Sequence, residues 1–116
     1  IVDRKKDIII RGGENISCQE VEAAIYEHPE ANECAVFGLP DERLGEIVGA
    51  VIWMKPGSTV DADAMCSFLS QRLAPYKVPS QIWMSNEALP KLGSEKIDKI
   101  TLRNQYRAAY GTQAAA

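Results

Sequence analysis

Apolar and polar positions alternate in short runs near the start of the chain, and this pattern predicts a β-hairpin. The run at 7–11 is rich in β-branched isoleucine, and a second short stretch follows at 14–16. Between them stand Gly12 and Gly13. Glycine reaches positive φ angles without a Cβ clash, so two glycines between such runs are typical of a tight hairpin turn.

Helical spacing of apolar residues predicts helices in other parts of the chain. The first is expected at about 18–27, where Ser17 is placed to cap the N-terminus and Glu20 follows three residues later, as in a capping box. Two more are expected at about 61–73 and 97–107. The alanine-rich tail after the last helix, at 108–116, is expected to fray.

Longer apolar runs predict the sheet. Runs at 33–39 and 46–54 flank a polar turn and are expected to pair antiparallel. A third run at 81–84 follows the segment 75–79, which is expected to be an extended linker because it holds two prolines. This order of elements predicts an α+β fold, a small domain with a short N-terminal hairpin and a mainly antiparallel three-stranded sheet packed by helices.

Composition and charge narrow the classes of function. The chain has 116 residues, of which 46% are hydrophobic, and this suits one globular domain. No apolar run is long enough to predict a transmembrane helix. The net charge of −3 argues against a nucleic-acid-binding protein. Basic residues are concentrated at 1–11 and 91–107. If the fold brings these stretches together, they form a site for a small anion; otherwise the charges are simply solvated.

The cysteines and the start of the chain indicate a cytoplasmic fragment. Cys18, Cys34 and Cys66 are widely spaced and odd in number, so they predict neither a disulfide framework nor a metal site. Free, largely buried thiols in a reducing cytoplasm are the expected state. The chain begins without methionine and without the apolar core of a signal peptide, so we expect an excised part of a longer protein.

Two motifs carry candidate chemistry. The stretch RGGEN at 11–15 holds glycines that leave backbone N–H groups free for a ligand, although a plain hairpin turn explains the same residues. The second motif is a lysine-bearing loop at 89–99, where a flexible ammonium can reach a phosphate, although exposed lysines are usually only solvated. Neither motif is a complete active site.

Together and in this order, the motifs resemble those of adenylate-forming enzymes. The stretch DRKKDIIIRGGENI at 3–16 resembles their hinge-and-glycine motif, and LPKLGSEKIDK at 89–99 resembles their C-terminal lysine motif. The segments AVFGLPD at 35–41 and YKVP at 76–79 are similar to the same family. The resemblance covers 1–107 and is strongest to acyl-CoA synthetases of the fatty-acid or aryl-acid type.

The resemblance implies the mobile C-terminal domain of an ATP-dependent, AMP-forming ligase, inactive when isolated. Such enzymes convert a carboxylic acid and ATP into an acyl-adenylate and pyrophosphate, and then pass the acyl group to the thiol of CoA. ATP and CoA are therefore implied as substrates, and Mg²⁺ is implied to bind with ATP on a large N-terminal domain, the expected partner. The resemblance also implies a hinge segment at 1–7 and a mobile domain at 8–107.

Single residues take roles from the same resemblance. Lys96 is implied as the catalytic lysine of adenylation, Lys6 as the hinge residue, and Arg4 as a contact to the nucleotide. Contacts to CoA and its pantetheine arm are implied at Gly12, Gly13, Glu14, Asn15, Tyr76 and Lys77.

One position departs from the family pattern, because Glu95 stands where relatives usually carry glycine, directly before Lys96. A carboxylate beside the ammonium could form an ion pair that holds Lys96 away from phosphate, and whether this weakens adenylation stays open. Two alternatives stay open. One is an adenylating enzyme with a different acceptor, such as a carrier protein or a luciferase-like reaction. The other is a binding module without catalysis.

Overall fold

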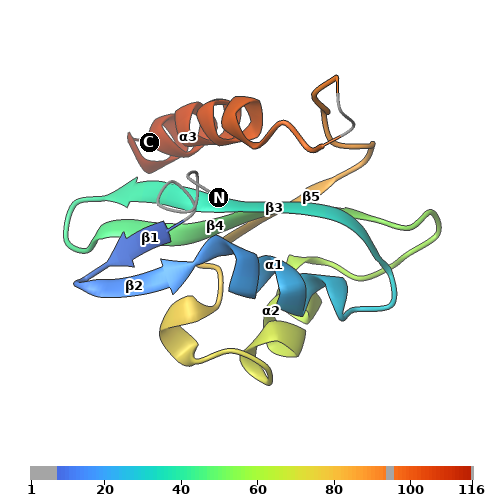
Figure 1. Ribbon diagram of the computed structural model, residues 1–116, viewed down its shortest axis with the longest axis horizontal. Coiled ribbons are helices and arrows are strands. Elements are labelled where there is room, and N and C mark those ends of the chain that lie inside the picture. The colour runs from blue at the N-terminus through green and yellow to red at the C-terminus, as the bar shows by residue number, and fades with distance from the viewer. Residues whose placement is uncertain (1–7, 94–95, 116) are drawn as a thin grey trace.

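The computed structural model describes residues 8–93 and 96–115, and for 111–115 it describes the backbone alone. The elements follow in the order β1 (Ile8–Arg11), β2 (Glu14–Ser17), α1 (Cys18–Tyr26), β3 (Ala31–Asp41), β4 (Gly45–Met54), α2 (Ala62–Ser70), the 3₁₀ helix η2 (Pro75–Lys77), β5 (Gln81–Ser85) and α3 (Lys99–Ala115). They build a sheet between α3 on one face and α1 with α2 on the other (Figure 1). The α+β fold expected from the sequence is confirmed.

The predicted hairpin is present and is formed by β1 and β2. Its antiparallel register runs from Ile8↔Ser17 to Arg11↔Glu14. Gly12 and Gly13, at the turn, have φ angles of 57° and 90°, which side chains with a Cβ adopt only under strain. This geometry explains the glycine pair in the sequence.

Side chains cap the first two helices, and the cap of the first was predicted from its sequence. The Oγ of Ser17 accepts a hydrogen bond from the N–H of Glu20 at 3.4 Å, and Asp61 accepts one from the N–H of Ala64 at 2.8 Å. The capping box of α1 is only half formed, because the carboxylate of Glu20 binds the ammonium of Lys77 instead. The missing half is therefore replaced by a contact to a distant segment.

β4 is the central strand of the sheet, because β1, β3 and β5 all pair with it. β3 and β4 pair antiparallel through a continuous register from Glu33↔Trp53 to Asp41↔Gly45, as predicted. β5 also pairs with β4, but in the parallel sense. The hairpin joins through the pair Arg11↔Gly45, which completes a five-stranded sheet.

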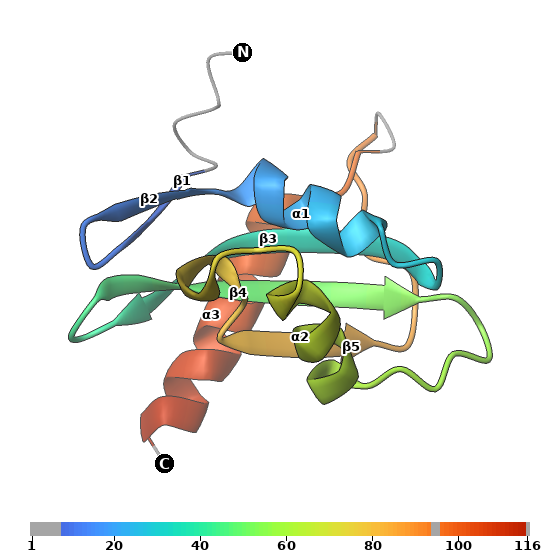
Figure 2. The same cartoon turned by 90° about the horizontal axis from the view of Figure 1, so that it is seen from below.

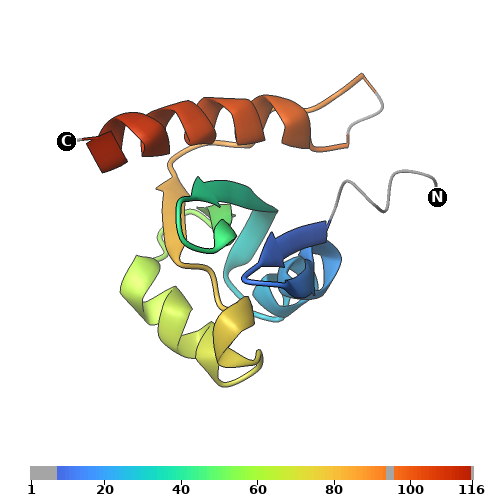
Figure 3. The same cartoon turned by 90° about the vertical axis from the view of Figure 1, so that its left-hand side faces the viewer.

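Both faces of the central strands are buried, so their apolar runs are continuous rather than alternating with polar residues. Cys34 and Val36 of β3 belong to the core that packs under α1 and α2. Ala35 and Phe37 belong to a second core under α3, around Leu102. Figure 3 shows the two helical layers on opposite sides of the sheet. One sheet therefore connects two separate cores.

Two boundaries differ from those predicted. The segment expected to be an extended linker contains the 3₁₀ helix Pro75–Lys77, because proline is tolerated in the first turn of a short helix. The last helix begins at Lys99, and the predicted end at 107 is wrong, since the helix continues to Ala115. Within the described residues, no helix combines the length and the apolar character needed to cross a bilayer.

Candidate active site

The turn of the β1–β2 hairpin displays the glycine motif at the surface. Gly12, Gly13, Glu14 and Asn15 are all exposed. The turn is fixed by the backbone, because the N–H of Gly12 donates to the carbonyl of Leu44 at 2.8 Å. A Cβ on Gly13 would meet no atom within 4 Å, so its free side faces open space that a ligand can approach.

Tyr76 and Lys77, the other predicted CoA contacts, lie on η2 beside the start of α1. The Nζ of Lys77 stands 3.0 Å from both carboxylate oxygens of Glu20 and 5.6 Å from the centre of the Tyr76 ring. The hydrogen bond to Glu20 raises the pKa of the Lys77 ammonium above its ordinary value. Lys77 is therefore already paired, and a phosphate bound there would share it with Glu20.

The predicted catalytic residue, Lys96, is exposed on the loop between β5 and α3. The backbone on either side of it forms a short antiparallel bridge, Lys91↔Ile97. The N–H of Leu92 donates to the carbonyl of Lys96 at 2.7 Å, and the N–H of Asp98 donates to that of Pro90 at 2.8 Å. The backbone of Lys96 is thus held while its side chain faces the surface.

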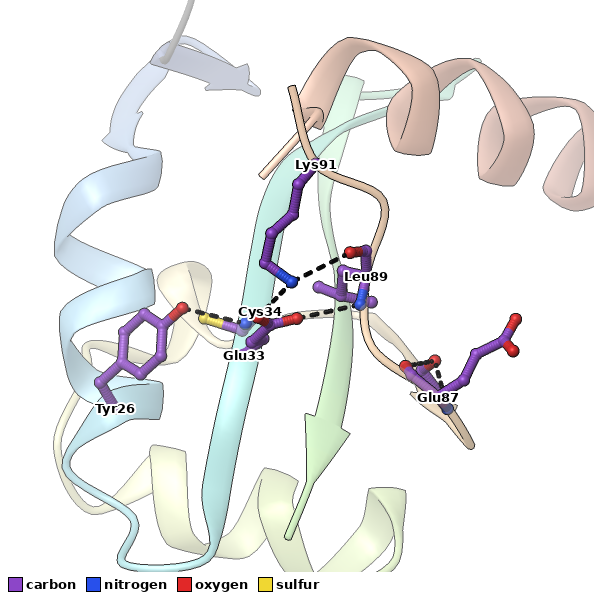
Figure 4. Close-up of polar contacts among 7 residues, drawn as sticks. Tyr26, Glu33, Cys34, Glu87, Leu89 and Lys91 are labelled. Atoms are coloured by element: carbon purple, nitrogen blue, oxygen red, sulfur yellow. Dashed lines mark hydrogen bonds and ion pairs between the residues drawn. The ribbon is translucent and has the colours of Figure 1, made fainter. Parts of the chain in front are cut away.

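Side chains fasten the start of this loop to β3 (Figure 4). The carboxylate of Glu33 accepts a hydrogen bond from the N–H of Leu89 at 2.9 Å and pairs with the Nζ of Lys91 at 2.6 Å. The same Nζ donates to the carbonyl of Leu89 at 3.3 Å. Leu89 itself is buried in the core under α3. Each hydrogen bond to a charged group stabilises such an arrangement by about 1.5–3 kcal/mol.

The pKa of Glu33 reflects these contacts. Partial burial by itself would raise the pKa, but the hydrogen bond and charge of Lys91, with the hydrogen bond from Leu89, outweigh burial and leave it below the ordinary value for glutamate. Glu33 therefore carries a full negative charge at neutral pH. No local pattern marks this residue, because its partners lie 56 and 58 positions further along the chain.

A second set of contacts fastens the end of the loop. Asp98 caps α3 through hydrogen bonds from the N–H and the hydroxyl of Thr101, at 3.1 and 2.8 Å. The next residue, Lys99, pairs with Glu22 of α1 at 2.9 Å. Arg107 further along α3 donates to the carbonyl of Gly38 at 2.9 Å. The loop therefore lies between two anchored ends.

The two groups of predicted site residues lie far apart. The hairpin turn and the loop before α3 stand at opposite ends of the domain (Figure 2). η2 lies near the hairpin, below β2 and beside the start of α1 (Figures 1 and 3). The structure thus gathers the predicted CoA contacts toward one end and places Lys96 at the other. Lys6, Arg4 and Glu95 lie outside the described residues.

A cavity of about 440 Å³ lies between the sheet and α3. Ile8 and Ile9 line it from β1, while Lys99, Arg103 and Arg107 line it from α3. The described residues of the first basic stretch that line the cavity are therefore apolar, and the basic side chains that line it come from α3. The Nε of Arg103 is buried and has no hydrogen-bond partner among the described residues. Whether the cavity binds an anion stays a prediction.

The cysteines are free thiols in the structure. Burial, with the nearby carboxylate of Glu22, raises the pKa of the Cys34 thiol to about 12. Burial also raises the pKa of Tyr26, whose hydroxyl accepts the N–H of Cys34 at 3.1 Å, to about 12. Both groups are therefore protonated at neutral pH, and Cys34 is unsuited to act as a nucleophile. Among the described residues, no group of three or more His, Cys, Asp or Glu side chains is arranged to hold a metal ion.

Comparison with known proteins decides the family. Residues 20–96 match the family described as the AMP-binding enzyme C-terminal domain. The chain belongs to this family. The resemblance expected from the glycine and lysine motifs is thereby confirmed. This AMP-binding C-terminal domain is 45% identical over 106 residues to the feruloyl-CoA synthase of an Amycolatopsis species, covering 91% of the chain and 21% of that protein.

Solved structures share both the fold and the sequence of this AMP-binding C-terminal domain. A fatty acyl-CoA synthetase of Mycobacterium tuberculosis matches with a TM-score of 0.81 and 40% identity, over 90% of the chain and 20% of the other. The o-succinylbenzoate-CoA synthetase of Bacillus subtilis, solved with an acyl-adenylate intermediate, matches with a TM-score of 0.77 and 34% identity, over 86% and 20%. The chain therefore spans about a fifth of the length of these relatives.

Proposed function

We propose that this domain is the mobile C-terminal part of an ATP-dependent, AMP-forming acyl-CoA ligase. It completes the active site in two different poses, one for adenylation and one for thioester formation. The observation that carries the proposal is that the turn of the β1–β2 hairpin and the loop between β5 and α3, which holds Lys96, lie at opposite ends of one domain (Figure 2). A single pose cannot bring both ends to one bound nucleotide. A rotation at the hinge residue Lys6 presents them in turn.

In the first pose, Lys96 assists adenylation. A carboxylate oxygen of the acid attacks the α-phosphorus of ATP, and the bond from that phosphorus to the bridging oxygen breaks, so pyrophosphate leaves. Negative charge gathers on the transferring groups, and the ammonium of Lys96 neutralises it. Arg4 contacts the nucleotide nearby. The exposure of Lys96 and the anchoring of its loop at both ends support this role.

In the second pose, the hairpin end assists thioester formation. The thiol sulfur of CoA attacks the acyl carbonyl carbon, and AMP leaves with the electrons of the carbon–oxygen bond. The open side of the Gly12–Gly13 turn, with Glu14 and Asn15, lines the path of the pantetheine arm. Tyr76 and Lys77 contact the nucleotide part of CoA. Acyl-CoA and aryl-CoA ligases among the relatives support this acceptor.

ATP and the acid bind on the AMP-binding domain that precedes this chain in the ligase. We place Mg²⁺ with ATP on that domain as well, since the described residues offer no cluster of metal ligands. The bound ion supplies charge neutralisation for the phosphates. This chain contributes the ammonium of Lys96 in the first pose. In the second pose it contributes the backbone of the hairpin turn, which lines the path of the pantetheine arm.

The test of the proposal uses Lys96→Ala in the full ligase, with each half-reaction measured separately. Loss of a charge contact made in the transition state lowers the adenylation rate by about 100- to 1,000-fold. Thioester formation from supplied acyl-adenylate and CoA stays near the wild-type rate. Lys55→Ala is the matched control, because Lys55 is also an exposed lysine but lies after β4.

Three results would contradict the proposal. If both half-reactions fall equally in Lys96→Ala, the lysine is not specific to adenylation. If the acyl-adenylate forms but CoA is not used, the acceptor is a different group, such as a carrier protein. If neither half-reaction depends on Lys96, the domain acts as a binding module.

A further inference from the structure

Lys96 can act only if its loop is held in place, and the structure indicates what holds the first half of that loop. Leu89 is buried under α3 and marks the point where the chain leaves the core. Between Leu89 and Lys96, the described residues are exposed and belong to no helix or longer strand. The position of Lys96 therefore depends on the few contacts at the base of the loop.

Glu33 supplies two of those contacts from a rigid element. It lies on β3, whose register with β4 includes the pair Glu33↔Trp53. One of its oxygens accepts the N–H of Leu89 and the other pairs with Lys91, which is itself bridged to Ile97, the residue after Lys96 (Figure 4). Two bonds from one carboxylate fix orientation as well as distance.

We propose that Glu33 is a positioning residue for Lys96: by holding Leu89 and Lys91, it sets the pose of the lysine loop that adenylation requires. The inference rests on the proposed function. Glu33 touches no substrate; it acts through the Lys91↔Ile97 bridge on the residue beside it. A carboxylate suits this place because it accepts hydrogen bonds from a backbone N–H and from an ammonium at the same time. A glutamine amide still accepts the backbone N–H, but it binds the ammonium more weakly because it carries no charge.

The contact holds one end of the loop and lies at the edge of the core. The side chain of Glu33 is 18% exposed and that of Lys91 is 33% exposed, so the pair is neither fully buried nor free in water. It is also separate from the pair of Lys99 with Glu22, which fastens the other end of the loop. Loss of Glu33 therefore frees the start of the loop while α3 stays anchored.

The experiment compares Glu33→Gln and Lys91→Gln in the full ligase. Each variant lowers the kcat of adenylation by about tenfold to a hundredfold, as expected when a reacting group is displaced by about 1 Å. The KM for ATP and the rate of thioester formation stay unchanged, because the nucleotide site and the hairpin end are untouched. The charge-swapped pair Glu33→Lys with Lys91→Glu does not recover the lost rate, because an ammonium at position 33 cannot accept the N–H of Leu89.

Glu27→Gln is the matched control. Glu27 also forms an ion pair, with Arg72 at 2.9 Å, but it lies at the end of α1 rather than at the base of the lysine loop. It is expected to leave both half-reactions at their wild-type rates. A melting temperature measured for each variant shows whether any loss of rate follows a loss of fold.

Coupling to Lys96 separates positioning from a structural role. In a Lys96→Ala background, Glu33→Gln causes no further loss of adenylation, because the group it positions is gone. Equal losses in both half-reactions, additive losses with Lys96→Ala, or no loss in Glu33→Gln would each overturn the inference. If Lys96→Ala itself leaves adenylation intact, the proposed function fails instead, so the two failures are distinguishable.

Discussion

Different kinds of contact hold each of the two ends of the domain in its conformation. At the hairpin end, the turn is fixed by strand pairing and by the N–H of Gly12 on the carbonyl of Leu44. At the lysine end, the loop is fixed largely by charged side chains, with Glu33 between Leu89 and Lys91. The first end therefore depends on backbone conformation, and the second depends on charge.

Because of this difference, the two ends are expected to tolerate different kinds of substitution. Side chains at the hairpin turn can vary as long as glycine keeps the positive φ angles. The lysine loop tolerates a glycine replacement, because Gly93 has no positive φ and a Cβ there would meet no atom within 4 Å. Loss of charge at its base is expected to displace it. Backbone and charge can thus be perturbed independently.

Among the changes that test this comparison, Lys6→Pro is expected to have the largest effect on rate. It tests whether the two ends are used in turn. Proline fixes φ near −65°, so the hinge is confined to one pose. One half-reaction slows by about 100-fold, because the other end no longer reaches the bound nucleotide. Rapid-quench measurements of each half-reaction in the full ligase check this, with Lys6→Ala as the control. Unchanged turnover would mean that Lys6 is not the hinge.

The next effect is expected from Gly13→Ala, which tests the backbone-held end. The space around Gly13 is open, so the cost comes from the φ angle of 90° alone. A Cβ in this region costs about 1–2 kcal/mol, which corresponds to a roughly 5- to 30-fold larger population of the locally opened state. Hydrogen exchange at the β1–β2 amides of the ligase measures it. Gly93→Ala is the control, and equal protection in both variants would contradict the assignment of strain.

The smallest effect is a pH dependence at the charge-held end. Because the pKa of Glu33 is depressed in the folded protein, its contribution to stability is complete above the unfolded value of about 4.3. It is lost as the pH falls through the lower folded value. The melting temperature of the wild type minus that of Glu33→Gln therefore narrows in acid. If the difference in melting temperature grows as the pH falls, the pKa of Glu33 is not depressed in the folded protein.

Local patterns predicted much of the fold. The glycine pair predicted the hairpin turn, and Ser17 predicted the start of α1, because each acts within a few residues of itself. The antiparallel pairing of β3 with β4 followed from two apolar runs around a short turn. The length of α3 was missed, since an alanine-rich tail alone gives no sign of where packing ends.

Contacts between distant parts of the chain could not be predicted in the same way. The parallel pairing of β5 with β4 depends on a crossover through α2 and η2. Glu20 was assigned to its own helix cap, but Lys77 on η2 binds its carboxylate. Glu33 has no motif at all, because its function comes from Leu89 and Lys91 arriving beside β3 only in the folded chain.

The sheet that lies between two cores has a mechanical consequence. Packing on both of its faces stiffens it, so we expect the domain to move as one rigid body rather than to bend along its length. Under the proposed function, a rotation that brings one end toward the nucleotide then moves the other end away. The two poses would therefore exclude each other without any signal passing through the domain.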